Sequence, residues 1–190
     1  MTVPPALPEL RYNLALVGGR GSGKSSITRR ILRREKRFML FSLDDLIRYE
    51  EGGRTIPQIV DARGWMYFRD VEHEVTHKVG AFEGRALIDC GGGVVVDLDA
   101  EGNEVFSERK VNALKRRGLI VYLQRDPEYL TQRIAGDANR PSLSETQSFA
   151  EIMARRDPWY RRAADYVFPC GELGKTEIVD GVLDWYYAQL

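Results

Sequence analysis

A glycine-rich stretch near the start of the chain combines residues whose types and spacing suit phosphate chemistry. Residues 18–25 match the pattern G-x-x-x-x-G-K-[ST], with an apolar run at residues 14–17 before them and a helix-forming segment at residues 27–34 after them. Gly18, Gly21 and Gly23 let the backbone adopt turns that are closed to other residues, so that successive N–H groups can converge on phosphate oxygens. The pattern therefore predicts a loop that binds the phosphates of a nucleoside triphosphate.

The end of this loop carries the groups that phosphoryl transfer needs. The Lys24 ammonium can bridge the β- and γ-phosphates, and the Ser25 hydroxyl can hold a magnesium ion. We therefore expect ATP and Mg²⁺ as cofactors and Lys24 as a catalytic residue. A plain glycine turn between a strand and a helix is the alternative, but the Gly-Lys-Ser ending and both flanks favour the phosphate site. The residues of this loop expected to contact the nucleotide are Gly19, Gly21, Ser22, Gly23, Lys24, Ser25 and Ser26.

The composition favours a single domain that acts on a small molecule. A chain of 190 residues can bury one core and is too short for two independent domains and a linker. Lys plus Arg and Asp plus Glu balance at 28 each, so no overall charge attracts nucleic acid or a membrane surface. There is no signal-peptide pattern or membrane-spanning run, and two cysteines, Cys90 and Cys170, are too few for a disulfide framework. We expect a cytoplasmic monomer with free thiols.

Apolar runs and helical periodicity alternate along the chain, which is typical of an α/β protein with a parallel sheet and helices on both faces. Buried strands are expected at residues 14–17, 38–41, 86–89, 119–123 and 166–168. Helices are expected at residues 27–34, 44–51, 108–117, 127–134 and 145–156, with an amphipathic helix at the C-terminus. A break at Gly64 should divide residues 53–79 into two helices, and Ser42 should cap the helix that follows the second strand.

Three segments fall outside this alternation. Residues 1–11 contain three prolines and are expected to form a flexible tail. Residues 94–106 alternate around Glu101, Gly102 and Asn103, which predicts a surface β-hairpin of unassigned role. Residues 136–144 are polar and rich in turn formers, and they suit a short lid over the site.

Several segments together resemble the shikimate kinase family of P-loop kinases, from Asn13 to about Gln189. Besides the phosphate loop, they are the helix DDLIRYEEGGRTIPQIV, the motif G-x-x-x-F-R-x-x-E, the triple glycine at 91–93, an Arg-Pro pair at Arg140, and R-x-P-x-Y from Arg156. The segments follow the family's order and spacing. The resemblance implies a P-loop kinase fold with a five-stranded parallel sheet of order 2-3-1-4-5. It also implies ATP-dependent phosphorylation of the 3-hydroxyl of shikimate, a step toward chorismate and the aromatic amino acids.

The resemblance further implies roles for individual residues. Asp44 matches the aspartate that binds the ring hydroxyls of shikimate, and Arg69 and Arg156 match the arginines that clamp its carboxylate. Arg140 matches the lid arginine that closes over the phosphates, and Glu72 would orient Arg69. The glycine loop would also touch shikimate, most directly through the middle one of Gly91, Gly92 and Gly93.

The chemistry of these residue types agrees with the implied roles. A guanidinium presents paired donors that match a carboxylate, and an aspartate beside an acceptor hydroxyl can orient it and take its proton. Simpler interpretations exist for each residue: Arg69 and Glu72 are spaced like a surface helix pair, and Asp44 could complement a helix dipole. Arg156 lies in a run of charges that would usually face solvent. Their joint occurrence with an intact phosphate loop favours the site.

The chain departs from the family at the expected metal site. The family usually has D-x-D after the second strand, with the first aspartate supporting magnesium through water, and here that position is Ser42. Asp89 ends the third strand, where the family usually has a small or neutral residue, and we expect both strand ends to flank the phosphate-loop strand. We therefore predict that Asp89 supports magnesium together with Ser25. The alternative is an acid satisfied by N–H groups of the glycine loop.

Two other departures leave competing functions open. Trp65, which we interpret as a packing residue, replaces the glutamate of the family's G-E-x-x-F-R, and the hairpin at residues 94–106 is longer than usual. One alternative is a related kinase of another hydroxy acid, such as gluconate. The other is a kinase-like sensor of an aromatic acyl-coenzyme A, but such regulators usually carry a DNA-binding segment and eroded substrate residues, whereas Asp44, Arg69 and Arg156 are retained.

Overall fold

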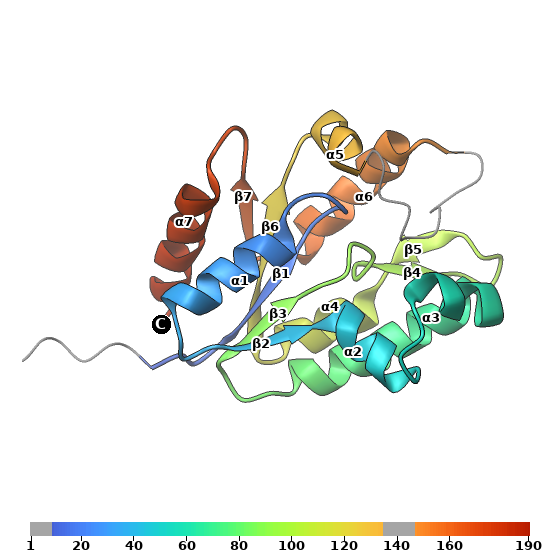
Figure 1. The fold of residues 1–190 in the computed structure, drawn as a ribbon, viewed down its shortest axis with the longest axis horizontal. Helices are drawn as coiled ribbons and strands as arrows, with labels where there is room; N and C mark the ends of the chain where they lie inside the picture. Colours follow the sequence, from blue (N-terminus) through green and yellow to red (C-terminus); the bar gives the residue numbers. More distant parts are fainter. Residues whose placement is uncertain (1–8, 135–146) are drawn as a thin grey trace, which may run out of the picture.

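Five parallel strands form the centre of the protein, and helices cover both faces of the sheet (Figure 1). The structure is a computed structural model that describes residues 9–134 and 147–190. The strands are β1 (Asn13–Val17), β2 (Met39–Ser42), β3 (Ala86–Asp89), β6 (Gly118–Gln124) and β7 (Tyr166–Pro169), in the order β2-β3-β1-β6-β7. This is the predicted order 2-3-1-4-5 when the two strands of a separate hairpin, β4 (Val96–Leu98) and β5 (Glu104–Phe106), are left out of the count.

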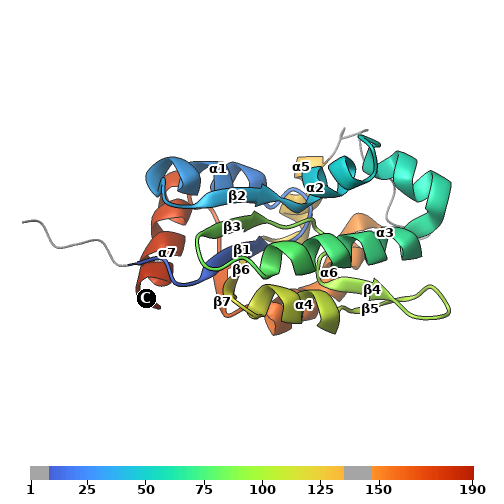
Figure 2. The same cartoon turned by 90° about the horizontal axis from the view of Figure 1, so that it is seen from below.

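Alternating side chains of the buried strands divide the core into two layers. In β1, Leu14 and Leu16 belong to one layer, and Ala15 and Val17 belong to the other. The first layer is completed by α1 (Lys24–Arg34) and α7 (Lys175–Tyr187). The second is completed by α2 (Leu43–Glu50), α3 (Ile56–Gly80), α4 (Glu108–Lys115) and α6 (Phe149–Ala163). Figure 2 shows α1 and α4 on opposite sides of the sheet.

A glycine interrupts the longest helix at the predicted place. Gly64 has φ 81° and ψ 168° inside α3, a conformation that is not helical. The predicted break is therefore confirmed, and α3 consists of two helical segments that meet at an angle. The second segment, which carries Arg69 and Glu72, runs against the sheet, because Val71, Val75 and Val79 are buried in the second core layer.

The helix after the undescribed segment differs from its predicted bounds. It begins at Phe149 rather than at residue 145, because the Ser148 hydroxyl accepts the N–H of Glu151 and the Glu151 carboxylate accepts the N–H of Ser148. It then continues through Pro158 to Ala163 as one helix. The start of α6 packs against α5 (Pro127–Ile134) in a small apolar cluster of Leu130, Ile152 and Met153.

The predicted hairpin is confirmed. β4 (Val96–Leu98) and β5 (Glu104–Phe106) pair antiparallel, with Val96 opposite Phe106 and Leu98 opposite Glu104. The Asp99 carboxylate accepts the backbone N–H groups of Glu101 and Asn103 at 3.0 and 2.8 Å, which fixes the turn between the strands.

Several predictions concern residues at the edges of the described chain. The lid at residues 136–144, including Arg140, lies outside the described residues, as does the tail at residues 1–11 except for its last three residues. Cys90 and Cys170 are free, as predicted, and both are buried. Within residues 9–134 and 147–190, no helix is long and apolar enough to cross a bilayer.

Candidate active site

The loop between β1 and α1 has the backbone shape that its glycines predict. The φ angle is 85° at Gly21 and 94° at Gly23, values that residues with a Cβ rarely adopt. The Lys24 Nζ atom donates hydrogen bonds to the carbonyl oxygens of Gly18 (2.8 Å) and Gly19 (3.0 Å), and the Lys24 side chain is buried. The ammonium group is thus held inside the curve of the loop at the N-terminus of α1, where anions bind favourably.

A cavity of about 420 Å³, which we call the phosphate cavity, opens in front of this loop. Two of the seven nucleotide contacts predicted in this loop, Gly19 and Ser22, do not line the cavity. The Ser22 hydroxyl instead lies 3.4 Å from the Lys24 ammonium, and a Cβ at Gly19 would meet the Met153 side chain. The predicted contacts that do line the cavity are Gly21, Gly23, Lys24, Ser25 and Ser26.

The lining of the phosphate cavity includes several residues with oxygen-bearing side chains. They are Ser25, Ser42, Asp44, Asp45 and Asp89. Hydroxyl and carboxylate oxygens are the ligands that Mg²⁺ prefers, usually one or two from the protein with the rest from phosphates and water. The residues therefore fit a magnesium ion that arrives with a nucleotide. In the described part of the chain, no group of three or more His, Cys, Asp or Glu side chains is placed to hold a metal by itself.

Asp89 and Ser42 end two neighbouring strands and lie side by side in register. The Ser42 hydroxyl caps α2 by accepting the N–H of Asp45, as predicted. Asp89 is also in register with Leu16 of β1, but β2 is not adjacent to β1. The expectation that both strand ends flank the phosphate-loop strand is therefore wrong for Ser42. Among the described residues, no hydrogen bond or ion pair engages the Asp89 carboxylate, including any from the glycine loop.

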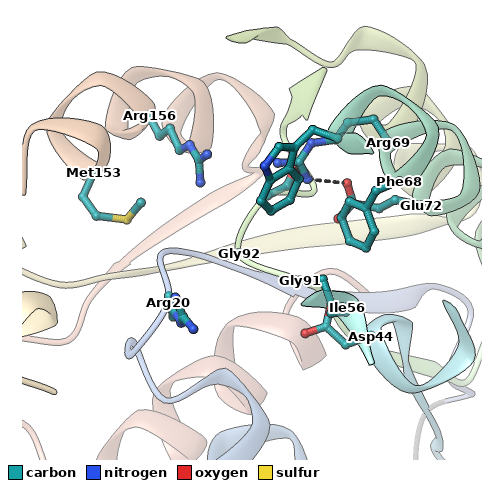
Figure 3. A pocket seen from close by; sticks show the side chains of 12 residues that line it. Arg20, Asp44, Ile56, Phe68, Arg69, Glu72, Gly91, Gly92, Met153 and Arg156 are labelled. Carbon is teal, nitrogen blue, oxygen red and sulfur yellow. Dashed lines mark hydrogen bonds and ion pairs between the residues drawn. The ribbon is translucent and has the colours of Figure 1, made fainter. Parts of the chain in front are cut away.

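A second cavity, which we call the acceptor cavity, adjoins the first (Figure 3). The two share Arg20, Asp44, Gly91 and Gly92 as lining residues. The remaining wall comes mostly from α3 and α6 and includes Arg69 and Arg156, which line only the acceptor cavity. Asp44 is therefore placed where the two cavities meet, with cationic groups on both sides of it.

Arg69 enters the acceptor cavity from α3 and is only 4% exposed. Its Nη1 atom donates to Glu72 Oε2 at 2.8 Å and to the Gly93 carbonyl at 3.3 Å. Glu72 Oε2 also accepts from the buried Lys110 ammonium at 2.7 Å. Burial alone would raise the pKa of Glu72, but the charges of Lys110 and Arg69 outweigh burial and keep that pKa below its ordinary value. Arg69 and Glu72 are thus not a surface helix pair.

Arg156 enters from α6 and is 1% exposed, so it does not lie on a solvated face. Its Nε atom donates to Glu104 Oε2 at 3.0 Å, and its Nη2 atom donates to Glu104 Oε1. Arg155 Nη2 donates to Glu104 Oε2 at 2.7 Å. Glu104 belongs to β5, so the hairpin of unassigned role contacts a predicted substrate-binding residue.

The triple-glycine loop after β3 leaves room for side chains of the site. A Cβ at Gly91 would lie 2.7 Å from Asp44 Oδ1, and a Cβ at Gly93 would collide with the Arg69 guanidinium. The three adjacent glycines in the sequence predicted a place where the backbone and a ligand approach each other closely. The structure shows in addition that the space at Gly91 and Gly93 is used by two of the predicted site residues.

Other residues of the acceptor cavity were not predicted from the sequence. Trp65 lines the cavity, with its ring centroid 5.2 Å from the Arg69 guanidinium carbon, and so it is not only a packing residue. Two features of the sequence could have indicated these roles: Trp65 replaces the glutamate of the family motif, and Arg20 lies inside the phosphate loop. Nothing near Lys110 or Glu104 in the sequence indicated that these residues contact charged side chains of the site. The other lining residues without a predicted role are Arg20, Ile56, Phe68 and Met153.

This arrangement suits the transfer of a phosphoryl group to a small anion. The phosphate cavity shares four lining residues, Asp44 among them, with a cavity that is also lined by two buried arginines. A guanidinium is matched to a carboxylate or phosphate in shape as well as charge. The chain can therefore hold an anionic acceptor with one of its hydroxyl groups near Asp44 and the phosphate loop.

The chain is similar to known shikimate kinases. A family model described as shikimate kinase matches residues 20–187. Shikimate kinase of Leptospira biflexa serovar Patoc is 40% identical over 173 residues, which cover 91% of this chain and 94% of the relative. Shikimate kinase of Pseudomonas fluorescens is 35% identical over 175 residues, covering 90% and 94%.

Solved structures give the same result. Shikimate kinase from Acinetobacter baumannii in complex with shikimate superposes with a TM-score of 0.77 and 26% identity, covering 94% of each chain. Shikimate kinase from Aquifex aeolicus superposes with a TM-score of 0.72 and 27% identity, covering 90% of this chain and 94% of the other. The predicted P-loop kinase fold is confirmed, and the chain belongs to the shikimate kinase family.

Proposed function

We propose that the protein transfers the γ-phosphoryl group of ATP to the 3-hydroxyl of shikimate, forming shikimate 3-phosphate on the route to chorismate and the aromatic amino acids. The observation that carries this proposal is the acceptor cavity, where two buried arginines from different helices face a region next to the phosphate loop. Shikimate is a small carboxylic acid with ring hydroxyls, so it offers one group to the arginines and another to the phosphates. Family membership supports the same acceptor.

Each site residue has a role in this proposal. Arg69 and Arg156 bind the shikimate carboxylate, and the loop at Gly92 supports the ring. Asp44 orients the 3-hydroxyl and accepts its proton as the phosphoryl group is transferred. Lys24 and, from the lid, Arg140 neutralise charge on the transferring group.

The magnesium site in this proposal differs from the usual site of the family, because Ser42 stands where the family usually has an aspartate. Mg²⁺ would reduce the charge on the β- and γ-phosphates when it is bound with ATP. We propose that the Ser25 hydroxyl and the Asp89 carboxylate support it, because both line the phosphate cavity and Ser42 supplies no charge.

A magnesium titration tests the role of Asp89. Asp89→Asn should raise the magnesium concentration needed for half-maximal activity and lower kcat, and adding Ser42→Asp to this variant should restore part of the loss. The strands place positions 42 and 89 side by side, which makes this exchange possible. Wild-type and Asp89→Asn curves that superimpose after scaling for maximal rate would leave Asp89 as a structural acid only.

Identifying the product tests the function itself. In separate reactions, the purified protein is incubated with ATP, Mg²⁺ and either shikimate or gluconate, and the products are analysed by phosphorus and proton NMR. We expect one phosphate ester from shikimate, coupled to the proton on C3, and none from gluconate. A phosphate at another ring position would overturn the assignment of the hydroxyl, and a product formed only from gluconate would favour the alternative kinase. The monomeric state and the cytoplasmic location stay predictions.

A further inference from the structure

The second strand of the hairpin after the glycine loop begins with a carboxylate, that of Glu104, which contacts two neighbouring arginines of α6. Glu104 Oε2 accepts from Arg156 Nε at 3.0 Å and from Arg155 Nη2 at 2.7 Å, while Glu104 Oε1 accepts from Arg156 Nη2. The Arg156 side chain is 2% exposed and that of Glu104 is 15% exposed. The residues are about 50 positions apart in the chain, so this contact depends on the hairpin being placed against α6.

The direction of the contact separates Glu104 from the ligand space. Glu104 occupies the edge of the Arg156 guanidinium formed by Nε and Nη2, which uses two of its five N–H donors. Arg156 lines the acceptor cavity, whereas Glu104 is not among the residues that line it. Figure 3 shows the Arg156 guanidinium pointing toward the centre of this cavity. Glu104 therefore contacts Arg156 from outside the cavity and leaves part of the guanidinium for a ligand.

The charges of the cluster leave room for an anion. Two arginines and one glutamate carry a net charge of about +1, so Glu104 reduces the positive charge of this corner without cancelling it. On the other side of the cavity, Arg69 and Lys110 share Glu72, and Lys110 also lies 3.5 Å from the Asp97 carboxylate. Arg69 and Arg156 thus each contact one carboxylate that also contacts a second cation.

We propose that Glu104 is a positioning residue, which holds Arg156 in the orientation that binds the carboxylate of the acceptor. The inference rests on the proposed function, because it assigns Arg156 to the acceptor. An arginine side chain has several rotatable bonds, and a two-point contact with a carboxylate removes most of that freedom before the acceptor arrives. The hairpin therefore contributes to acceptor affinity although it does not line the cavity.

Glu104→Gln is the direct test, because glutamine keeps the size of the side chain and removes the second acceptor oxygen and the charge. We expect the KM for shikimate to rise by about tenfold, with the KM for ATP changed by less than about twofold, because only the acceptor side loses an oriented donor. Glu101→Gln is the matched control. It removes the same charge from an exposed position in the turn of the same hairpin, and it should leave both KM values unchanged.

A double-mutant cycle distinguishes positioning from general damage. Arg156→Lys alone should also raise the KM for shikimate. Glu104→Gln added to Arg156→Lys should then raise it by much less than about tenfold, because the group that Glu104 orients is already gone. Multiplied effects of the two substitutions would mean that Glu104 acts independently of Arg156 and would overturn the proposal.

Further outcomes are equally decisive. A lower KM for shikimate in Glu104→Gln would mean that Glu104 competes with the acceptor for Arg156, and an unchanged KM would mean that Arg156 needs no support. If thermal melting shows that Glu104→Gln is unfolded, Glu104→Asp keeps the charge and should give a smaller rise in the same KM with kcat retained. The proposed function and the role of Glu104 can fail separately. If the wild-type protein shows no shikimate-dependent turnover, the proposed function is wrong. If the wild type turns over shikimate and Glu104→Gln has the same KM for shikimate, only the role of Glu104 is wrong.

Discussion

Replacing Glu72 with glutamine should weaken the fold and the binding of the acceptor together. Glu72 Oε2 lies 2.7 Å from the Lys110 ammonium and 2.8 Å from Arg69 Nη1. The side chains of Glu72 and Lys110 are 2% and 0% exposed. Both cations contact the same oxygen, so the amide oxygen of a glutamine could still accept from them, but the side chain would carry no charge. The change would leave buried positive charge without its main counterion.

The size of the effect follows from this burial. Breaking a buried ion pair by removing one partner typically costs about 3–5 kcal/mol. Lys110 keeps the Val96 carbonyl at 2.5 Å and the Asp97 carboxylate at 3.5 Å, so we expect the lower end of that range, about 3 kcal/mol. For a chain of this length, that loss corresponds to a melting temperature lower by about 6–12 °C.

Urea unfolding measures the free energy, and steady-state kinetics measures the effect on Arg69. Glu74→Gln is the control, because Glu74 is exposed on the same helix, and its loss should change the free energy of unfolding by no more than about 0.5 kcal/mol. We also expect a higher KM for shikimate in Glu72→Gln only. A loss of stability below about 1 kcal/mol would refute the argument from burial. Lost stability with an unchanged KM would show that Glu72 does not orient Arg69.

Three other predictions test separate parts of the site. Lys24→Ala should lower kcat by at least about a hundredfold without unfolding the protein, as judged by circular dichroism, because it removes a charge on the transferring phosphoryl group; near-wild-type turnover would contradict the phosphate-loop assignment. Gly93→Ala should raise the KM for shikimate but not for ATP, because the new Cβ would displace the Arg69 guanidinium. Equal increases in both KM values would contradict an effect that is specific to Arg69. The hydrogen bond from Arg37, partly opposed by burial, lowers the pKa of Glu35 to about 2, so its stabilising contribution is complete above its ordinary pKa and is lost as the pH falls toward 2. Urea unfolding should thus show a smaller difference between pH 5 and pH 3 for Glu35→Gln than for wild type, and identical differences would exclude this role.

Features that depend on local sequence were predicted well. The phosphate loop follows from a fixed pattern in which φ above zero demands glycine at Gly21 and Gly23. The break at Gly64 follows from the same conformational freedom, and the cap at Ser42 follows from a hydroxyl that can accept an orphan N–H group. The sheet order and the arginines of the acceptor cavity came from resemblance to a family rather than from periodicity.

Features that depend on distant pairings were not predictable. Glu104 lies in a short hairpin strand, and nothing near it in the sequence indicates that its partners are in α6. Lys110 lies in a helix rich in charge, where a fully buried ammonium is exceptional, and its burial is explained by distant partners, Glu72, Asp97 and the Val96 carbonyl. The start of α6 was misjudged because the capping pair of Ser148 and Glu151 outweighs the general helix-forming composition before it.

Initial rates of ADP formation test the central claim most directly. The purified protein is assayed in a coupled assay with ATP and Mg²⁺ and with shikimate, gluconate or no acceptor, and Arg69→Lys is assayed beside it. We expect ADP formation that depends on shikimate, a background rate with gluconate or without acceptor, and a higher KM for shikimate in Arg69→Lys, because a two-point contact becomes a single contact. Equal rates with and without shikimate, or a preference for gluconate, would contradict the assignment of shikimate as the acceptor.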